Sequence, residues 1–132
     1  MSEINQLVSL AYEDIETAEF LFSGQRYRSC LSRAYYAMYY SAQALLLSEN
    51  IETSTHKGVI KLINMHFVRT NQLDRTIFKL LSDAYDLRQL GDYSPNFIAT
   101  SLSAREAIDN AQIFIDEINR ILNLKNNNTI DN

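Results

Sequence analysis

The sequence contains no tryptophan, one cysteine, one proline, three glycines and two histidines. The single cysteine, Cys30, excludes an intramolecular disulfide and a metal site built from several cysteines. Cys30 lies at a position in phase with an apolar helix, which predicts that its thiol is buried and inert. The scarcity of glycine and proline favours long helices. The 132 residues are 46% apolar and 21% charged, which is typical of one ordinary globular domain.

Long apolar runs are also missing, and no basic leader precedes an apolar stretch, so we expect a cytoplasmic protein that does not enter a membrane. The net charge of −4 and a pI near 5.1 give no overall attraction for nucleic acid, so RNA could bind only through a local basic patch. His56 and His66 lack neighbouring ligand residues, which argues against a metal site and predicts capping or surface histidines. Neither a glycine-rich phosphate loop nor a nucleophile elbow occurs, and no cofactor is expected.

Apolar residues recur at helical spacing along most of the chain, and no strand-like alternation interrupts them. The sequence therefore predicts an all-α fold, an up-and-down antiparallel helical bundle of about five helices. We expect this single domain to span residues 1–124 and a disordered polar tail to follow at 125–132. The first helix covers residues 4–22 and ends at Gly24, and the second begins near residues 25–28 and runs to about residue 50.

Polar breaks divide the second half of the sequence. Hydroxyl residues at 53–55 are caps for a third helix that ends at about residues 69–72. A fourth helix starts near Asp74 and is expected to fray at 91–95, because Gly91 and Pro95 both oppose its continuation. A loop at 96–100 leads to the fifth helix, in which Ser103 and Glu106 have the spacing of a capping box.

The second helix carries an unusual density of tyrosine, in the stretch SRAYYAMYY from Ser32 to Tyr40. It is nearly apolar all round, which is typical of a helix at the centre of a bundle. Arg33, Tyr36 and Tyr40 share one face, where the guanidinium could stack on or bond to the rings. Tyrosine suits a surface that is apolar in body and polar at its rim. Two readings stay open: core tyrosines with satisfied hydroxyls, or a cleft or interface that binds a ligand.

Arg88 poses a second question, because it lies in helical register with the apolar side of the fourth helix. A guanidinium cannot be buried there without a partner. Asp92 follows at the spacing at which the two side chains can pair, and Tyr93 is next to it. One interpretation is a structural ion pair. The other is a cleft arginine that offers its fork of donors to a phosphate, against the unfavourable dipole of the helix C-terminus.

Four stretches in this order, SRAYYAMYYSAQALL, THKGVIKLI, LRQLGDY and EAIDNAQIFIDEI, resemble small bacterial and archaeal HEPN-domain proteins over about residues 4–124. The resemblance implies a helical bundle that forms a homodimer, with the end of the fourth helix near the dimer groove. It also implies a minimal nucleotidyltransferase as antitoxin partner, in a two-gene toxin–antitoxin or defence system. Ribonucleases of the family are metal-independent and use an arginine followed after about four to six residues by a histidine, the group that moves a proton.

Arg88 and Gln89 match the start of that motif, but Tyr93, Ser94 and Pro95 stand where the histidine is expected. Family toxins are silenced by transfer of AMP to a nearby tyrosine, which makes Tyr93 the candidate acceptor. The alternative is a catalytically inert module that binds RNA, a nucleotide or another protein. The candidate catalytic residues are Arg88, Asp92 and Tyr93, and the candidate binding residues are Arg33, Tyr36, Tyr40 and Gln89.

Overall fold

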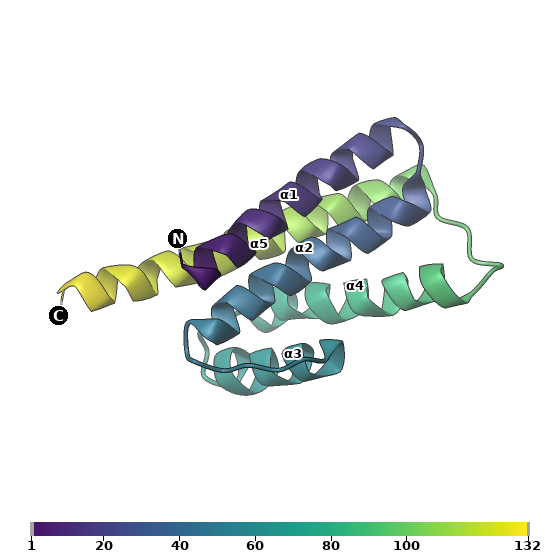
Figure 1. The fold of residues 1–132 in the computed structure, drawn as a ribbon. Helices are drawn as coiled ribbons and strands as arrows, with labels where there is room; N and C mark the ends of the chain where they lie inside the picture. The colour runs from purple at the N-terminus through teal and green to yellow at the C-terminus, as the bar shows by residue number, and fades with distance from the viewer. Residues whose placement is uncertain (1, 132) are drawn as a thin grey trace.

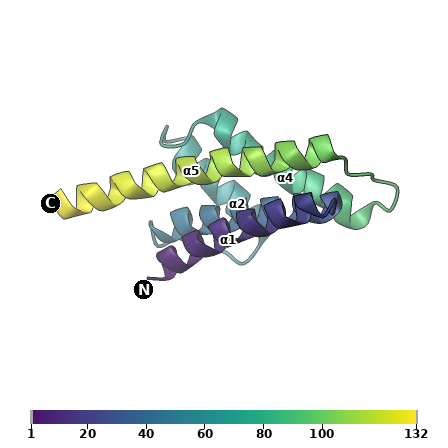
Figure 2. The same cartoon turned by 90° about the horizontal axis from the view of Figure 1, so that it is seen from above.

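The computed structural model describes the backbone of residues 2–131 and the side chains of residues 2–126. Its regular elements are α1 (Glu3–Ser23), α2 (Tyr27–Leu47), α3 (His56–Ile63), a π-helical turn (Asn64–Val68), α4 (Arg75–Tyr93) and α5 (Ser101–Asp131). The predicted all-α bundle is confirmed, and the described residues include no strand. Figures 1 and 2 show α1, α2 and α5 running side by side, with α4 and the short α3 packed against them.

Helix α2 is the centre of the bundle, as its apolar character predicts, and it contacts α1, α3, α4 and α5. Its largest buried side chains are Tyr35, Met38 and Leu45, each no more than 1% exposed. Small residues such as Ala37, which is fully buried, let the neighbouring helices approach closely. Cys30 is buried in the same helix, as the sequence predicts.

Helix α3 begins directly after Thr55, within the stretch 53–55 where the sequence predicts its cap. The connection from α2 runs back alongside α3 before the helix starts (Figure 1). Thr55 caps the helix by accepting a hydrogen bond from the Gly58 amide at 2.9 Å. A Cβ at Gly58 would collide with the hydroxyls of Thr53 and Thr55, so the loop packs tightly on the first turn. As a result His56, the first residue of α3, lies beside the middle of α2.

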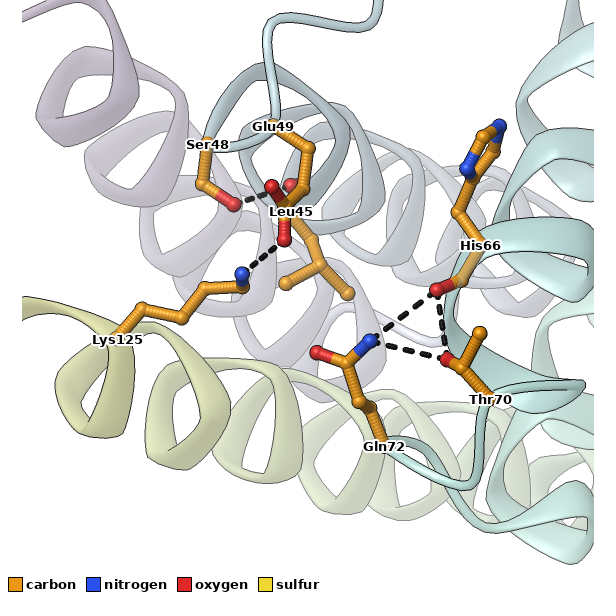
Figure 3. Close-up of polar contacts among 7 residues, drawn as sticks. All are labelled: Leu45, Ser48, Glu49, His66, Thr70, Gln72 and Lys125. Atoms are coloured by element: carbon orange, nitrogen blue, oxygen red, sulfur yellow. Dashed lines mark hydrogen bonds and ion pairs between the residues drawn. The ribbon is translucent and has the colours of Figure 1, made fainter. Parts of the chain in front are cut away.

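The π-helical turn follows α3 directly and closes with a hydrogen bond from the Arg69 amide to the Asn64 carbonyl. Figure 3 shows that the His66 carbonyl accepts bonds from Thr70 and Gln72 while the His66 imidazole points away from both. The side chain of His66 is exposed, as predicted for a surface histidine.

Helix α4 ends within residues 91–95, where the sequence predicts that it frays. It continues to Tyr93, because Arg28 of α2 donates hydrogen bonds to the Gly91 and Phe97 carbonyls at 2.7 and 2.5 Å. A side chain from another helix thus satisfies a carbonyl of the last turn.

Helix α5 starts directly after the predicted loop at 96–100, but Ser103 and Glu106 do not form its capping box. The helix begins at Ser101, and Thr100 and Ser103 form the reciprocal pair: each hydroxyl accepts a bond from the other residue's amide, at 3.0 and 2.9 Å. The capping box is therefore three residues earlier than expected, with a serine hydroxyl in place of the Glu carboxylate.

The far end of α5 extends to Asp131, across the stretch for which the sequence predicts a disordered tail. Lys125 is anchored by an ion pair with Glu49, the residue two positions after α2 (Figure 3). Side chains from 127 on lie outside the described residues, so the boundary at 125 stays a prediction. Within the described chain, none of the helices combines the length and apolarity that a membrane span needs.

Candidate functional site

Arg88 lies on α4 with its side chain only 15% exposed, against the tyrosine face of α2. Its Nε atom is 3.1 Å from Oδ2 of Asp92, one turn further on. Its Nη2 atom donates a hydrogen bond to the Tyr36 hydroxyl at 3.2 Å. The guanidinium also lies over the rings of Tyr36 and Tyr35, 5.2 and 5.6 Å from their centroids. The predicted pairing with Asp92 is present, and two aromatic rings hold the arginine as well.

The Arg88 guanidinium is not saturated by these contacts. Its Nε–H is buried and makes no well-directed hydrogen bond, so the contact with Asp92 is electrostatic. A guanidinium has five N–H donors, and Tyr36 receives the one directed side-chain bond that Arg88 makes among the described residues. The Asp92 side chain is 35% exposed, so water can reach it. The arginine is therefore held in place by Asp92 and the two rings, and not all of its N–H donors are used.

Arg33 lies one turn before Tyr36 on α2, and its guanidinium is 4.7 Å from the centroid of the Tyr36 ring. Asp14 of α1 holds it through a contact of 3.1 Å between Nη1 and Oδ1. Burial raises the pKa of Asp14 although Arg33 opposes the shift. Tyr40 continues the group, with its ring 6.2 Å from that of Tyr36. The structure thus brings Arg33, Tyr36 and Tyr40 together with Arg88, as the shared helix face predicts.

Gln89 and Tyr93 lie on other sides of α4. The Gln89 amide donates to the Tyr85 hydroxyl at 2.7 Å, so it braces a ring that borders the site. Tyr93 is 75% exposed and lines a shallow hollow with Asp86, Leu90 and others. Most of the Tyr93 surface is therefore open to solvent.

His56 belongs to this site, although its place in the sequence predicts only a capping or surface histidine. Its Nδ1 atom is 2.7 Å from the hydroxyl of the buried Tyr35. Its ring stacks on Tyr39 with centroids 4.3 Å apart and an angle of 26° between the planes. It also meets Tyr36 edge to face at 5.8 Å. The imidazole of His56 and the guanidinium of Arg88 therefore contact the same two rings, those of Tyr35 and Tyr36.

The surroundings change the proton affinity of two of these groups. Burial lowers the pKa of His56 below its ordinary value of 6.5, and the positive charge of Arg88 lowers it further. Burial raises the pKa of the Tyr35 hydroxyl, which keeps that hydroxyl protonated at neutral pH. The imidazole is therefore neutral near pH 7. We call the group formed by Tyr35, Tyr36, Tyr39, His56 and Arg88 the aromatic site.

No set of three or more His, Cys, Asp and Glu side chains gathers into a metal-binding group within the described part of the chain. The chemistry that the aromatic site itself offers is anion binding by arginine and proton transfer by a neutral imidazole.

The fold and this site define a small helical-bundle protein whose central tyrosine-rich helix presents an arginine. The HEPN domain matches residues 4–121. A protein named putative toxin MJ0605, from Methanocaldococcus jannaschii, is 35% identical over 91% of this chain and 89% of its own length. Putative toxin MJ0142 of the same organism is 32% identical over 94% and 84%. A UPF0332 protein of Thermotoga maritima is 30% identical over 85% of each chain. The chain belongs to the HEPN-domain family, which confirms the resemblance.

Proposed function

We propose that this chain is the toxin-type HEPN component of a two-gene toxin–antitoxin or defence system, and that it cleaves RNA in the cytoplasm as a homodimer without a metal. The observation that carries the proposal is Arg88, an arginine whose side chain is 15% exposed and whose guanidinium lies over the rings of Tyr35 and Tyr36. A guanidinium fork binds a phosphodiester and stabilises the charge that develops during its cleavage. Relatives named putative toxins support the same role.

The aromatic site suits single-stranded RNA for a second reason. Unpaired bases stack on tyrosine, and each stacked base contributes about 1–3 kcal/mol. Tyr36 and Tyr40 are partly exposed next to Arg33 and Arg88, so a base and a phosphate could be held side by side. Local arginines would supply the attraction that the net charge of −4 does not.

The direct test is cleavage of total cellular RNA by the purified protein, compared with Arg88→Ala and with Arg69→Ala as a matched control. Arg69 is exposed and lies outside the aromatic site. We expect cleavage by the unchanged protein and by Arg69→Ala, and loss of cleavage in a folded Arg88→Ala variant. Intact RNA in the lane of the unchanged protein would refute the ribonuclease proposal.

The homodimer is supported by an exposed apolar surface near the end of α4. Leu90 is 50% exposed, Ile98 81% and Leu102 71%, on the last turns of α4, the following loop and the first turn of α5. Exposed large apolar side chains on these consecutive segments favour an interface there. In sedimentation we expect a species twice the 15.2 kDa monomer, which Leu90→Lys dissociates. Phe20→Lys, at a position of α1 that is 78% exposed, should leave it unchanged.

The antitoxin proposed for this system is a minimal nucleotidyltransferase that transfers AMP to Tyr93. The Tyr93 oxygen would attack the α-phosphate of ATP, pyrophosphate would leave, and the phenol proton would pass to solvent. The exposure of Tyr93 supports access to a second enzyme. Incubation with a nucleotidyltransferase encoded beside this chain should add the mass of one AMP to the protein but not to Tyr93→Phe. Modification of Tyr93→Phe to the same extent would refute this site.

A second candidate function is that of an inert binding module or interaction scaffold. It is favoured by the motif position where Tyr93 replaces histidine and by the ion pair of Arg88 with Asp92. An inert binder predicts that Arg88→Ala abolishes RNA or nucleotide binding while no protein lane cleaves RNA. A scaffold predicts that Arg88→Ala impairs folding instead.

A further inference from the structure

Cleavage of RNA at Arg88 needs a group that takes a proton from the attacking 2′-hydroxyl. Arginine remains charged under all physiological conditions and has no lone pair to offer. We infer that His56, from α3, is the catalytic base that works beside Arg88, and that Tyr35 is the positioning residue that orients it. The inference rests on the proposed ribonuclease function and assigns the proton transfer to a residue outside the arginine motif.

The orientation of the imidazole is fixed from two sides. The Tyr35 hydroxyl engages Nδ1 at 2.7 Å, and the Tyr39 ring covers one face of the imidazole at 4.3 Å. Tyr35 and Tyr39 are both buried in α2, so neither can follow a moving histidine. With Nδ1 occupied, Nε2 is the nitrogen left for a substrate, and the half-buried ring keeps an edge at the surface. Such preorganisation is what proton transfer at a defined atom requires.

The charge state of His56 also fits a base. The groups that face it are Tyr35, Tyr36 and Tyr39 from α2 and Tyr85 and Arg88 from α4. Burial among these rings and the nearby guanidinium both lower the pKa of the imidazole. A base at Nε2 requires the tautomer in which Nδ1–H donates to the Tyr35 oxygen and Nε2 carries the lone pair. His56 also opens α3, so the positive end of the helix dipole favours a phosphate beside it.

The reaction then balances without a metal. Nε2 of His56 takes the proton of the 2′-hydroxyl, and the 2′-oxygen forms a bond to phosphorus while Arg88 holds the phosphate oxygens. The bond from phosphorus to the 5′-oxygen breaks, and that oxygen leaves with the electron pair and takes a proton from water. The imidazolium returns its proton to the hydroxide. The products are a 2′,3′-cyclic phosphate and a 5′-hydroxyl end.

The two histidines of the chain provide a matched pair of variants. We expect His56→Gln to lower the kcat for RNA cleavage by about 100-fold or more, the usual contribution of a general base. His66→Gln, at an exposed position whose imidazole points away from its neighbours in Figure 3, should cleave at the rate of the unchanged protein. Both variants are checked for folding by urea denaturation.

A pH profile separates a catalytic histidine from one that only supports the structure. The rate of the unchanged protein should rise with pH through a pKa below 6.5, because the base must be neutral, and this rise should vanish in His56→Gln. Cleavage by His56→Gln at the full rate would overturn the assignment of His56 and leave the ribonuclease standing. Intact RNA with the unchanged protein would overturn both. If His56→Gln does not fold, a flat profile of the unchanged protein across this range would by itself refute the inference.

Discussion

Replacing Arg88 by methionine tests whether this arginine is kept for stability or for chemistry. Methionine preserves most of the apolar stem and removes the guanidinium, and with it three kinds of contact. The ion pair with a partly exposed Asp92 is worth about 0.5–1 kcal/mol, and the charged hydrogen bond to the Tyr36 hydroxyl about 1 kcal/mol, since that phenol can bond to water instead. The contacts over Tyr35 and Tyr36 add about 0.5–1 kcal/mol. We therefore expect Arg88→Met to lower the free energy of unfolding by about 2–3 kcal/mol.

Urea denaturation followed by far-ultraviolet circular dichroism measures this loss directly. Arg69→Met, at an exposed position, is the control and should stay within about 0.5 kcal/mol of the unchanged protein. A double-mutant cycle with Asp92→Asn isolates the ion pair, whose coupling should be about 0.5–1 kcal/mol. A loss above about 5 kcal/mol would refute this reasoning, because only a fully buried charge left unpaired costs that much. Arg88 would then be part of the scaffold.

Three further predictions concern the rest of the bundle. Arg105 lowers the pKa of the Glu19 carboxyl by hydrogen bonding to it. The contribution of this pair to the stability of the fold is therefore complete above the pKa of Glu19 in the unfolded chain, about 4.3, and is lost as the pH falls through its pKa in the folded protein. Glu19→Gln should accordingly cost about 0.5 kcal/mol in urea denaturation at neutral pH, and progressively less as the pH falls through the folded-state pKa of Glu19. Ala37→Leu should lower stability by about 1–3 kcal/mol in a thermal melt, because the fully buried site has no room for three more carbons. Burial raises the pKa of Cys30, so a disulfide reagent should label this thiol only as fast as the protein unfolds; rapid labelling of the native protein would contradict its burial.

Much of the fold could be predicted because the signals that set it are local. Apolar stripes at helical spacing gave the helices, and the apolar circumference of α2 gave its central place. The errors occurred where a distant residue decides the outcome. The end of α4 within 91–95 could be predicted, but the hydrogen bond from Arg28 of α2 to the Gly91 carbonyl could not. Thr100 outcompetes Ser103 as the cap because the two pair reciprocally.

The candidate site divides in the same way. Arg88 and Asp92 are four residues apart on one helix, and Arg33 and Tyr36 are three residues apart on another. Both contacts could therefore be predicted from the spacing of the residues in the sequence. The position of His56 could not. It depends on the path of the loop before α3, which doubles back and sets the histidine against Tyr35 and Tyr39. No periodicity in the sequence encodes that path.

The crowding of tyrosines on α2 makes the protein its own optical probe. The sequence has eight tyrosines and no tryptophan, and Tyr35, Tyr36, Tyr39, Tyr40 and Tyr85 form one cluster around His56 and Arg88. Near-ultraviolet circular dichroism arises from aromatic rings held in fixed tertiary packing. The tyrosine band of this protein therefore reports mainly on the aromatic site, and changes of its shape follow a ligand or a partner there without any added label.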